Sequence, residues 1–477
     1  MKERMEADSI GQMAVPADAY YGVQAERAAR NFQITGHKMN PVFINNLALI
    51  KEAAADVNEE AGLLSKVQRN AIVTACHEVM NGFFNDAFIV DPVQGGAGTS
   101  ANMNMNEVLA NRANELMGGG KGTYEFVHPN DHVNMAQSTN DTIPTAGRLT
   151  VIRLSEDLLT QLNLLQGALA VKGIEFADIV KMGRTQLQDA VPMKLGDTFR
   201  GYSDMVHRCI VRLEKTLEEM HVVNLGGTAI GTGINASDYY EEHIAEKLSE
   251  LFGEEIRQAD DLFDATENLD SFVAVSGSLK ACAMSLSKMC NDLRLLSSGP
   301  RCGLNEINLP AMQNGSSIMP GKVNPVIPEV VTQAAFLVAG HDTTIAMAAE
   351  AGQMELNAFE PVVFYQLFES ISALSNAVKT LRVNCIEGIT ANAEHCRNLE
   401  ESSTGIATTL CPVIGYKKAA MVARKALHEN RSVREVVLSE GILTEKRLNE
   451  LFENKGMGME GRLPIVTRKE EKVHPAA

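Results

Sequence analysis

The loop at Gly315–Pro325, with the sequence GSSIMPGKVNP, carries the residues best suited to chemistry in this chain. It places a hydroxyl pair, Ser316 and Ser317, near one lysine, Lys322, and one amide, Asn324. Glycines let successive backbone N–H groups approach an anion closely, and the lysine adds a full positive charge. Such a loop could hold Ser316 as an alkoxide, which makes this serine a candidate base.

Two simpler interpretations apply to the same loop. A nucleotide-binding loop has four residues between its first glycine and the Gly-Lys pair, followed by Ser or Thr. Here five residues intervene and Val323 follows Lys322, so that class is excluded. An ordinary surface turn is the common meaning of a run rich in Gly, Ser and Pro, but the apolar Ile318 and Met319 inside it argue against this.

Three further loops are dense in small hydrogen-bonding side chains and lie at the ends of predicted helices: Gly95–Glu107, His128–Asp141 and Gly183–Met193. Free N–H groups at a helix start could bind an anion, so these loops are candidate binding segments. Taken singly, each is more simply a helix N-cap with its turn, but their occurrence together with the Ser316 loop favours a shared site. The side chains concerned are Thr99, Ser100, Ser138, Thr139, Asn140, Thr185 and Gln186.

Motifs for metals and cofactors are weak in this sequence. His128 and His132 are spaced as a helical pair, but Pro129 lies between them and no third ligand is evident. Gly118–Thr123 lacks the first glycine and the hydroxyl of a phosphate loop, so we expect a helix stop and a turn. No GxSxG, HExxH or dinucleotide fingerprint appears. We therefore predict no metal and no cofactor.

Composition limits the fold class and the partners. A chain of 477 residues is expected to form two or three domains, and its 45% hydrophobic but only 5% aromatic residues favour helices over sheets. The net charge of -17 disfavours nucleic acid and anionic membranes as partners. Eight scattered cysteines without a CxxC pair suit a reducing compartment, and neither a secretory signal nor a membrane-spanning run is evident. We predict a soluble, cytoplasmic protein.

Apolar residues at alternating steps of three and four predict long helices in the middle of the chain. Rods of some 25 to 30 residues would be about 40 Å long at 1.5 Å per residue. Apolar stripes left over after packing within one chain usually contact another subunit, which predicts a homo-oligomer; a large helical monomer is the alternative. The stripes are Leu158–Leu169, Leu195–Met220, Phe272–Leu293 and Val363–Leu381.

Changes of pattern along the chain predict three domains. Residues 1–140 mix shorter helical patterns with glycine-rich loops and are expected to form an N-terminal domain. Residues 141–392 carry the long stripes and the Ser316 loop. Residues 393–477 lack the stripes and are expected to form a small C-terminal helical domain, in which Ser432–Phe452 predicts two short helices joined at Gly441.

Beyond these patterns, GSSIMPGKVNP closely resembles the signature of the aspartase/fumarase superfamily, whose members cleave C–N or C–O bonds and release fumarate. The segments DAYYGVQ, GGAGTSANMN, NDHVN, QSTND, GRTQLQDA and NLGGTAIGTG also match, so the resemblance covers nearly the whole chain. QSTND and VNPVIPEVV are more similar to aspartases than to fumarases, which usually carry Thr-His where this chain has Thr185-Gln186. The resemblance therefore implies a carbon–nitrogen lyase, with a class II fumarase as the alternative.

The resemblance also implies a reaction and roles for the candidate residues. The reaction would be the reversible anti-elimination of ammonia from L-aspartate, giving fumarate through an aci-carboxylate intermediate. Ser316 resembles the base of the family. The residues implied around the β-carboxylate are Thr99, Ser138, Thr139 and Ser317, those at the α-carboxylate are Thr185, Lys322 and Asn324, and those facing the amino group are Asn140 and Gln186.

For the fold, the resemblance implies a mainly α, three-domain aspartase/fumarase-type architecture. Its central bundle of long helices would assemble into a 20-helix core in a homotetramer, with active sites shared between subunits. A non-enzymatic crystallin on the same scaffold is a third alternative, but it predicts losses among the polar residues, and none is seen. Whether His128–Asp131 forms a second anion site, as in some fumarases, stays open.

Overall fold

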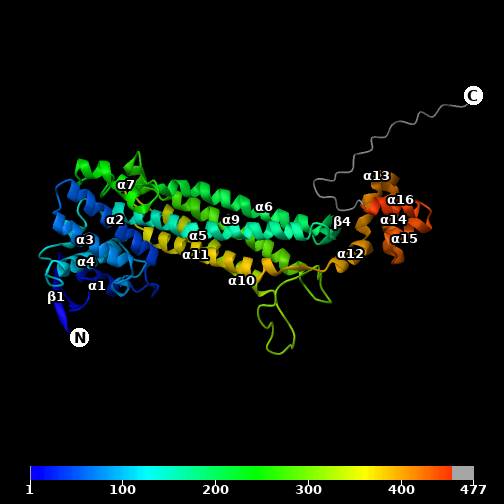
Figure 1. The fold of residues 1–477 in the computed structure, drawn as a ribbon, viewed down its shortest axis with the longest axis horizontal. Helices are drawn as coiled ribbons and strands as arrows, with labels where there is room; N and C mark the ends of the chain where they lie inside the picture. Colours follow the sequence, from blue (N-terminus) through cyan, green and yellow to red (C-terminus); the bar gives the residue numbers. More distant parts are fainter. Residues whose placement is uncertain (1, 454–477) are drawn as a thin grey trace, which may run out of the picture. The chain divides into compact units, whose positions relative to one another are not determined.

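The computed structural model describes residues 2–453, and residues 454–477 of the predicted C-terminal domain lie outside the described part. The described chain is mainly helical, which confirms the predicted fold class (Figure 1). It divides into two compact units, each described here by itself. The first contains Met1–Leu162, Arg208–Leu286 and Thr332–Val378, and the second contains Asn163–His207, Ser287–Val331 and Lys379–Ala477. The bounds of the three predicted domains stay a prediction.

The first unit begins with a hairpin and a group of shorter helices. Strands β1 (Glu3–Asp8) and β2 (Gly11–Pro16) pair antiparallel, with Glu3 opposite Pro16. Four helices follow, and α2 packs against α3, which packs against α4 (blue in Figure 1). They are α1 (Val23–Asn31), α2 (Pro41–Glu60), α3 (Lys66–Met80) and α4 (Thr99–Leu116).

Local sequence signals explain where these helices begin. Asn40 accepts a hydrogen bond from the N–H of Val42, and Pro41 occupies the first helical position of α2. Ser65 and Gln68 form a reciprocal capping box at the start of α3. These side chains satisfy N–H groups that have no partner within the helix.

Five long helices continue the chain: α5 (Thr139–Glu175), α6 (Leu195–Leu217), α9 (Asp270–Leu296), α10 (Val326–Glu350) and α11 (Glu360–Asn384). All four predicted stripes are buried along them, as Phe272, Leu279 and Leu293 on α9 illustrate. Each buried side chain of this size stabilises the fold by roughly 1.5–3 kcal/mol. The heptad pattern therefore predicted four of these five long helices correctly, and α10 was not predicted.

The long helices contact one another within each unit. In the first unit, Ser276 on α9 donates to Asp342 on α10 at 2.8 Å. In the second unit, Tyr202 on α6 donates to Asp292 on α9 at 3.0 Å, and Ser203 donates to the carbonyl of Gln166 on α5 at 3.1 Å. Polar contacts of this kind fix the axial register of the helices, which could slide along one another if only their apolar stripes were in contact.

The second unit adds a hairpin and the C-terminal helices. Strands β3 (Val180–Thr185) and β4 (Gln188–Lys194) pair antiparallel, with an irregularity between Met182 and Arg184. The C-terminal helices bury their own apolar cluster, which includes Leu410, Val422 and Val436. They are α12 (Ala393–Ser402), α13 (Cys411–Ile414), α14 (Tyr416–Glu429), α15 (Val433–Ser439) and α16 (Glu445–Glu453), and the last two confirm the pair of short helices predicted on either side of Gly441.

Short elements complete the described chain: β5 (Val222–Val223) pairs in parallel with β6 (Arg257–Gln258), β7 (Ile307–Asn308) pairs antiparallel with β8 (Thr390–Ala391), and α7 (Asp238–Phe252) and α8 (Leu262–Glu267) are helical. Helix α7 packs on α2 in the first unit. Among residues 2–453, no helix combines the length and the apolar character needed to cross a membrane.

Candidate active site

The predicted site residues fall into two groups, one in each compact unit. The first unit contains Thr99, Ser138, Thr139 and Asn140, which we call the polar shelf. The second unit contains Thr185 and Gln186 on a hairpin, and Ser316, Ser317, Lys322 and Asn324 in the loop Gly315–Pro325, which we call the signature loop.

Glycines set the position of Thr99 at the start of α4. Gly98 precedes it with φ of +84°, a conformation that favours glycine. A Cβ atom on Gly98 would lie 2.9 Å from Ile143 of α5, so only glycine permits this close approach of the two helices. Thr99 donates its hydroxyl hydrogen to the carbonyl of Gly96 at 2.7 Å. The first turn of α4 is thereby held against the start of α5.

Ser138 caps α5 from the position that the motif QSTND gives it. Its hydroxyl accepts from the N–H of Asn140 at 3.2 Å, while its own N–H donates to Asp141 at 3.0 Å. Together these bonds satisfy N–H groups at the start of the helix that have no partner within it. The other carboxylate oxygen of Asp141 accepts from the N–H groups of Gly226 and Thr228, so one buried side chain joins the shelf to the NLGGT segment.

Asn140 is held from the same segment. Its side-chain NH₂ donates to the carbonyl of Ala229 at 2.7 Å, and Asn224 donates to the carbonyl of Asn140 at 2.9 Å. The amide orientation of Asn140 is therefore fixed by a backbone acceptor. Its remaining side-chain atom, Oδ1, is an acceptor, which is what an ammonium group requires.

Thr185 and Gln186 lie at the tip of the β3–β4 hairpin, which corrects our expectation of a helix end. Gln186 and Leu187 both have positive φ, 53° and 62°, as a two-residue hairpin turn requires. Below the tip, Arg184 and Lys181 bind opposite oxygens of the fully buried Glu306 at 2.6 and 2.8 Å. The paired cations offset the burial of this carboxylate and fix the hairpin to the segment that leads into the signature loop.

The signature loop folds back on itself around Ser316. The N–H of Gly315 donates to the carbonyl of Lys322 at 2.7 Å, and Asn324 donates to the carbonyl of Gly315 at 3.0 Å. A Cβ atom on Gly315 would lie 2.7 Å from the Lys322 carbonyl oxygen, so glycine is needed for this closure.

Within the closed loop, Ser316 Oγ accepts two backbone hydrogen bonds. The N–H groups of Ile318 and Met319 donate to it at 3.2 and 3.0 Å. Donors aimed at one oxygen stabilise negative charge on it. Ile318 itself is 84% exposed, so the loop has little apolar packing of its own.

Two buried charges behind the polar shelf were missed by the sequence analysis. Lys51 on α2 is fully buried, and burial lowers its pKa to about 7. Asp141 is fully buried as well, and burial raises its pKa to about 6 against the lowering effect of its hydrogen bonds. The available signal was a lysine inside the apolar run NLALIKEAAA, residues 46–55, where a charge has no solvent-facing side to occupy.

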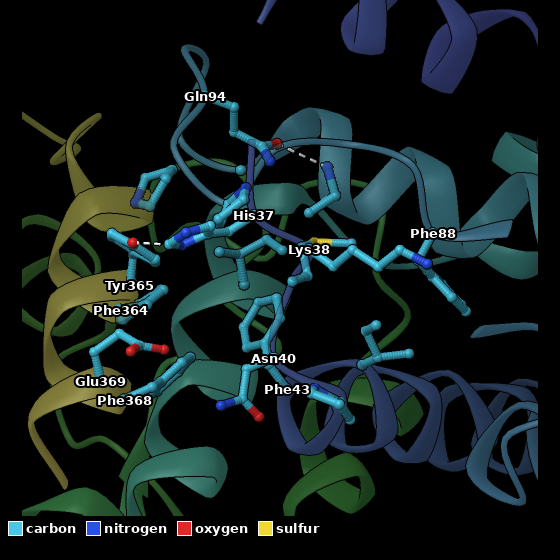
Figure 2. Close-up of a pocket in the computed structure, with 18 of the residues that line it drawn as sticks. His37, Lys38, Asn40, Phe43, Phe88, Gln94, Phe364, Tyr365, Phe368 and Glu369 are labelled. Carbon is cyan, nitrogen blue, oxygen red and sulfur yellow. Dashed lines mark hydrogen bonds between the residues drawn. The ribbon is translucent and has the colours of Figure 1, made fainter. Parts of the chain in front are cut away.

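A cavity of about 570 Å³ in the first unit lies behind the start of α4 (Figure 2). Its walls include Phe43, Phe364 and Phe368, with a hydrogen bond of 2.7 Å between Tyr365 and His37 at one edge. None of the predicted site residues lines it. Its largely aromatic walls offer little to a small anion, so this cavity does not indicate the predicted anion site.

His128 and His132, whose spacing alone could suggest a metal pair, form local hydrogen bonds. His132 Nδ1 accepts from the N–H of His128 at 2.8 Å, within a short π-helical turn at Pro129–Val133. His128 in turn accepts from the N–H groups of Asn130 and Asp131. Among residues 2–453, no group of three or more His, Cys, Asp or Glu side chains is arranged to hold a metal ion.

Comparison with known proteins places this architecture in a family. The family model described as Lyase matches residues 11–340, and the one described as Fumarase C C-terminus matches residues 406–458. The chain is 51% identical over 456 residues to the aspartate ammonia-lyase of Helicobacter pylori strain J99, covering 95% of this chain and 97% of that protein. It is 51% identical over 452 residues to the aspartate ammonia-lyase of Escherichia coli K12, covering 94% and 95%.

Solved structures give the same result. A crystal structure of fumarate lyase:delta crystallin from Brucella melitensis bound to cobalt has a TM-score of 0.92 and 47% identity, covering 95% of this chain and 98% of that one. A recombinant class II fumarase from Schistosoma mansoni has a TM-score of 0.91 and 35% identity, covering 94% and 98%. The chain belongs to the lyase family that includes the aspartate ammonia-lyases. This confirms the predicted family and enzyme class.

Proposed function

We propose that this protein catalyses the reversible elimination of ammonia from L-aspartate, giving fumarate. One observation carries the proposal: two backbone N–H groups of the signature loop donate hydrogen bonds to Ser316 Oγ, and the same loop contains Lys322. The similarity to aspartate ammonia-lyases over nearly the full chain supports the choice of substrate.

In the proposed reaction, Ser316 acts as an alkoxide and removes a proton from Cβ of aspartate. The C–H electron pair moves into the neighbouring carboxylate and gives an aci-carboxylate dianion. The pair then returns to form the C=C bond as the C–N bond breaks, and its electrons leave with nitrogen as ammonia. Because the amino group is already protonated, it leaves without a dedicated acid, and the proton on Ser316 returns to solvent.

The remaining predicted residues receive roles that suit their chemistry. Hydroxyl donors at Ser138, Thr139 and Ser317, and at Thr99 once its hydroxyl turns away from the Gly96 carbonyl, would stabilise the dianion, where fixed dipoles are most effective. Thr185, Lys322 and Asn324 would bind the α-carboxylate. Asn140 and Gln186 would face the amino group. The acceptor Oδ1 of Asn140, left by its bond to Ala229, fits that role.

We further propose a homotetramer with sites assembled from several subunits. Helix α10 supports this, because Phe336, Leu337 and Met347 are 63, 56 and 69% exposed along it. Exposed apolar side chains gathered on one helix indicate an interface with another chain. We also propose a cytoplasmic location, which suits the eight free thiols of the chain.

The proposal is tested by following fumarate formation through its ultraviolet absorbance, with L-aspartate and L-malate as separate substrates. We expect fumarate from L-aspartate, and consumption of fumarate when ammonium is added in excess. A class II fumarase would instead form fumarate from L-malate alone, and that result would overturn the proposal. Turnover of neither substrate would favour the non-enzymatic alternative.

A further inference from the structure

Lys51 holds three side-chain amides in one buried network behind the polar shelf. Its ammonium group donates to Asn102 Oδ1 at 2.7 Å, to Gln137 Oε1 at 2.8 Å and to Asn134 Oδ1 at 2.9 Å. The lysine is fully buried, and Asn102 is 1% exposed. All three partners are neutral, so no carboxylate contacts the ammonium directly in this set.

This arrangement fixes the direction of each amide. An ammonium group can only donate hydrogen bonds, so each amide must turn its oxygen toward Lys51 and its NH₂ group away. For Asn102, the NH₂ group then donates to Thr139 Oγ1 at 3.3 Å and to Asn134 Oδ1 at 3.1 Å. Without the lysine, the amide of Asn102 could rotate by half a turn and present its oxygen to Thr139.

The direction of the Asn102 amide decides what the Thr139 hydroxyl does. A hydroxyl has one hydrogen to donate. Because Thr139 accepts from Asn102, that hydrogen is directed to another acceptor, and the proposed dianion is one. If the amide were reversed, Thr139 would donate back to Asn102 Oδ1 and lose its donor for the substrate.

The energetics show that Lys51 is a costly residue to keep. Burying a cation among neutral partners costs several kcal/mol unless another charge compensates it. Asp141 is the attractive charge that acts on Lys51, but its oxygens are bonded to Ser138, Thr142, Gly226 and Thr228. A methionine of similar length would fill the space without that cost, so the fold alone does not explain the charge.

We propose that Lys51 is a positioning residue that orients the Asn102 amide so that the Thr139 hydroxyl donates to the substrate carboxylate. This inference rests on the proposed function, because it assigns Thr139 to that carboxylate. Lys51 itself contacts no substrate in this account. Its effect reaches the reaction through two hydrogen bonds.

The test is a double-mutant cycle between Lys51→Met and Thr139→Val, with kcat and KM measured for L-aspartate. We expect each single variant to lower kcat/KM by roughly 30- to 100-fold. Because Lys51 acts through Thr139, removing both should cost little more than removing one. The kcat/KM of the double variant should therefore be within about 3-fold of that of the less active single variant. A double variant whose loss equals the product of the two single losses would overturn the inference.

Asn102→Asp separates positioning from fold stability. An aspartate keeps the acceptor for Lys51 and adds an opposite charge, which offsets the lost donation to Asn134 Oδ1, so the melting temperature should stay near that of the wild type. It cannot donate to Thr139, so kcat/KM should fall by roughly 30-fold or more, with kcat changing more than the inhibition constant of succinate. An Asn102→Asp variant with wild-type kcat/KM would overturn the inference even if Lys51→Met failed to fold.

Lys172→Met is the matched control. Lys172 is another buried lysine, 7% exposed, which donates to Glu175 and to the carbonyl of Ile389 in the second unit. Its loss should leave kcat/KM within about 3-fold of the wild-type value.

If the wild-type protein forms no fumarate from L-aspartate, the proposed function fails first. The cycle is then measured on succinate affinity by calorimetry, where additive losses would overturn the inference separately.

Discussion

The polar shelf and the signature loop solve different problems with different structures. Thr139 of the shelf is buried, Ser138 and Asn140 are half-buried and Thr99 is exposed, and the shelf is held through several hydrogen bonds to Asn102, Asp141 and the NLGGT segment. The signature loop is largely exposed and is closed by two bonds around Gly315. In the proposed reaction, the shelf binds a carboxylate and needs donors fixed before charge develops, whereas the loop carries the base, which must reach the substrate and allow the product to leave. Changes in the two regions should therefore separate activity from stability.

The largest expected effect is the loss of Ser316. In Ser316→Ala, kcat should fall by about 10³-fold or more, because a base acts in the transition state. The melting temperature should not change, because water can replace Oγ as acceptor for the exposed Ile318 and Met319 N–H groups. The measurements are steady-state kinetics, succinate inhibition and thermal denaturation.

Ser402→Ala provides the control for that variant. Ser402 lies at the end of α12 and donates only to the carbonyl of Leu399 among the described contacts. Its loss should leave kcat and melting temperature near the wild-type values. Near-normal turnover by Ser316→Ala would show that another group is the base.

Removing the charge of Asp141 should lower both the stability and the activity of the protein. Asp141→Asn leaves an NH₂ group facing backbone donors and leaves Lys51 without its attractive charge. Removing the opposite charge that acts on a buried cation costs about 3 kcal/mol or more, and the shelf should lose its geometry. We expect a lower melting temperature and a fall in kcat/KM of about 10²-fold.

The control for Asp141→Asn is Asp178→Asn. Asp178 is fully exposed and pairs with Lys194 at 3.5 Å, and exposed pairs contribute little. The melting temperature and kinetics of Asp178→Asn should match those of the wild type. If Asp141→Asn kept both its stability and its kcat/KM, the shelf would not depend on its buried charges.

The contrast between the two regions also explains what could be predicted from the sequence. The heptad stripe of α9 and the glycine-bracketed signature loop are encoded by neighbouring residues, so periodicity and spacing were sufficient. The role of Lys51 depends on Asn102 and Gln137, which are distant in sequence, and no local pattern reports such pairing. The β3–β4 hairpin was missed because Gln186 and Leu187 replace the Asn-Gly pair that usually marks this turn.

A smaller effect is expected from Gly315→Ala in the signature loop. The new Cβ would meet the Lys322 carbonyl oxygen at 2.7 Å and the Asn324 N–H group at 2.9 Å, so the loop must open. We expect kcat to fall by about 10-fold through displacement of Ser316, with no change in melting temperature. Gly167→Ala is the control, because a Cβ there meets no atom within 4 Å. A fall in stability without loss of activity would contradict a functional loop.

The smallest effect concerns the pH dependence of stability around the shelf. Glu107 on α4 accepts from the N–H groups of Gly22, Gln24 and Ala25, and burial raises its pKa from 4.5 to about 7. A raised pKa in the folded state favours folding below pH 4.5, and this contribution is lost as the pH rises toward 7. The difference amounts to about 3 kcal/mol.

Glu107→Gln removes this titration and keeps a neutral side chain of the same size. The melting temperature of the wild type relative to this variant should therefore be highest near pH 5 and should fall by a few degrees by about pH 8. Thermal denaturation of both proteins across that range measures the difference. The signature loop has no comparable buried acid, so the same comparison between Gly315→Ala and the wild type should be flat. The opposite result is that the wild type becomes more stable relative to Glu107→Gln as the pH rises. It would mean that the three N–H donors outweigh burial and keep Glu107 ionised.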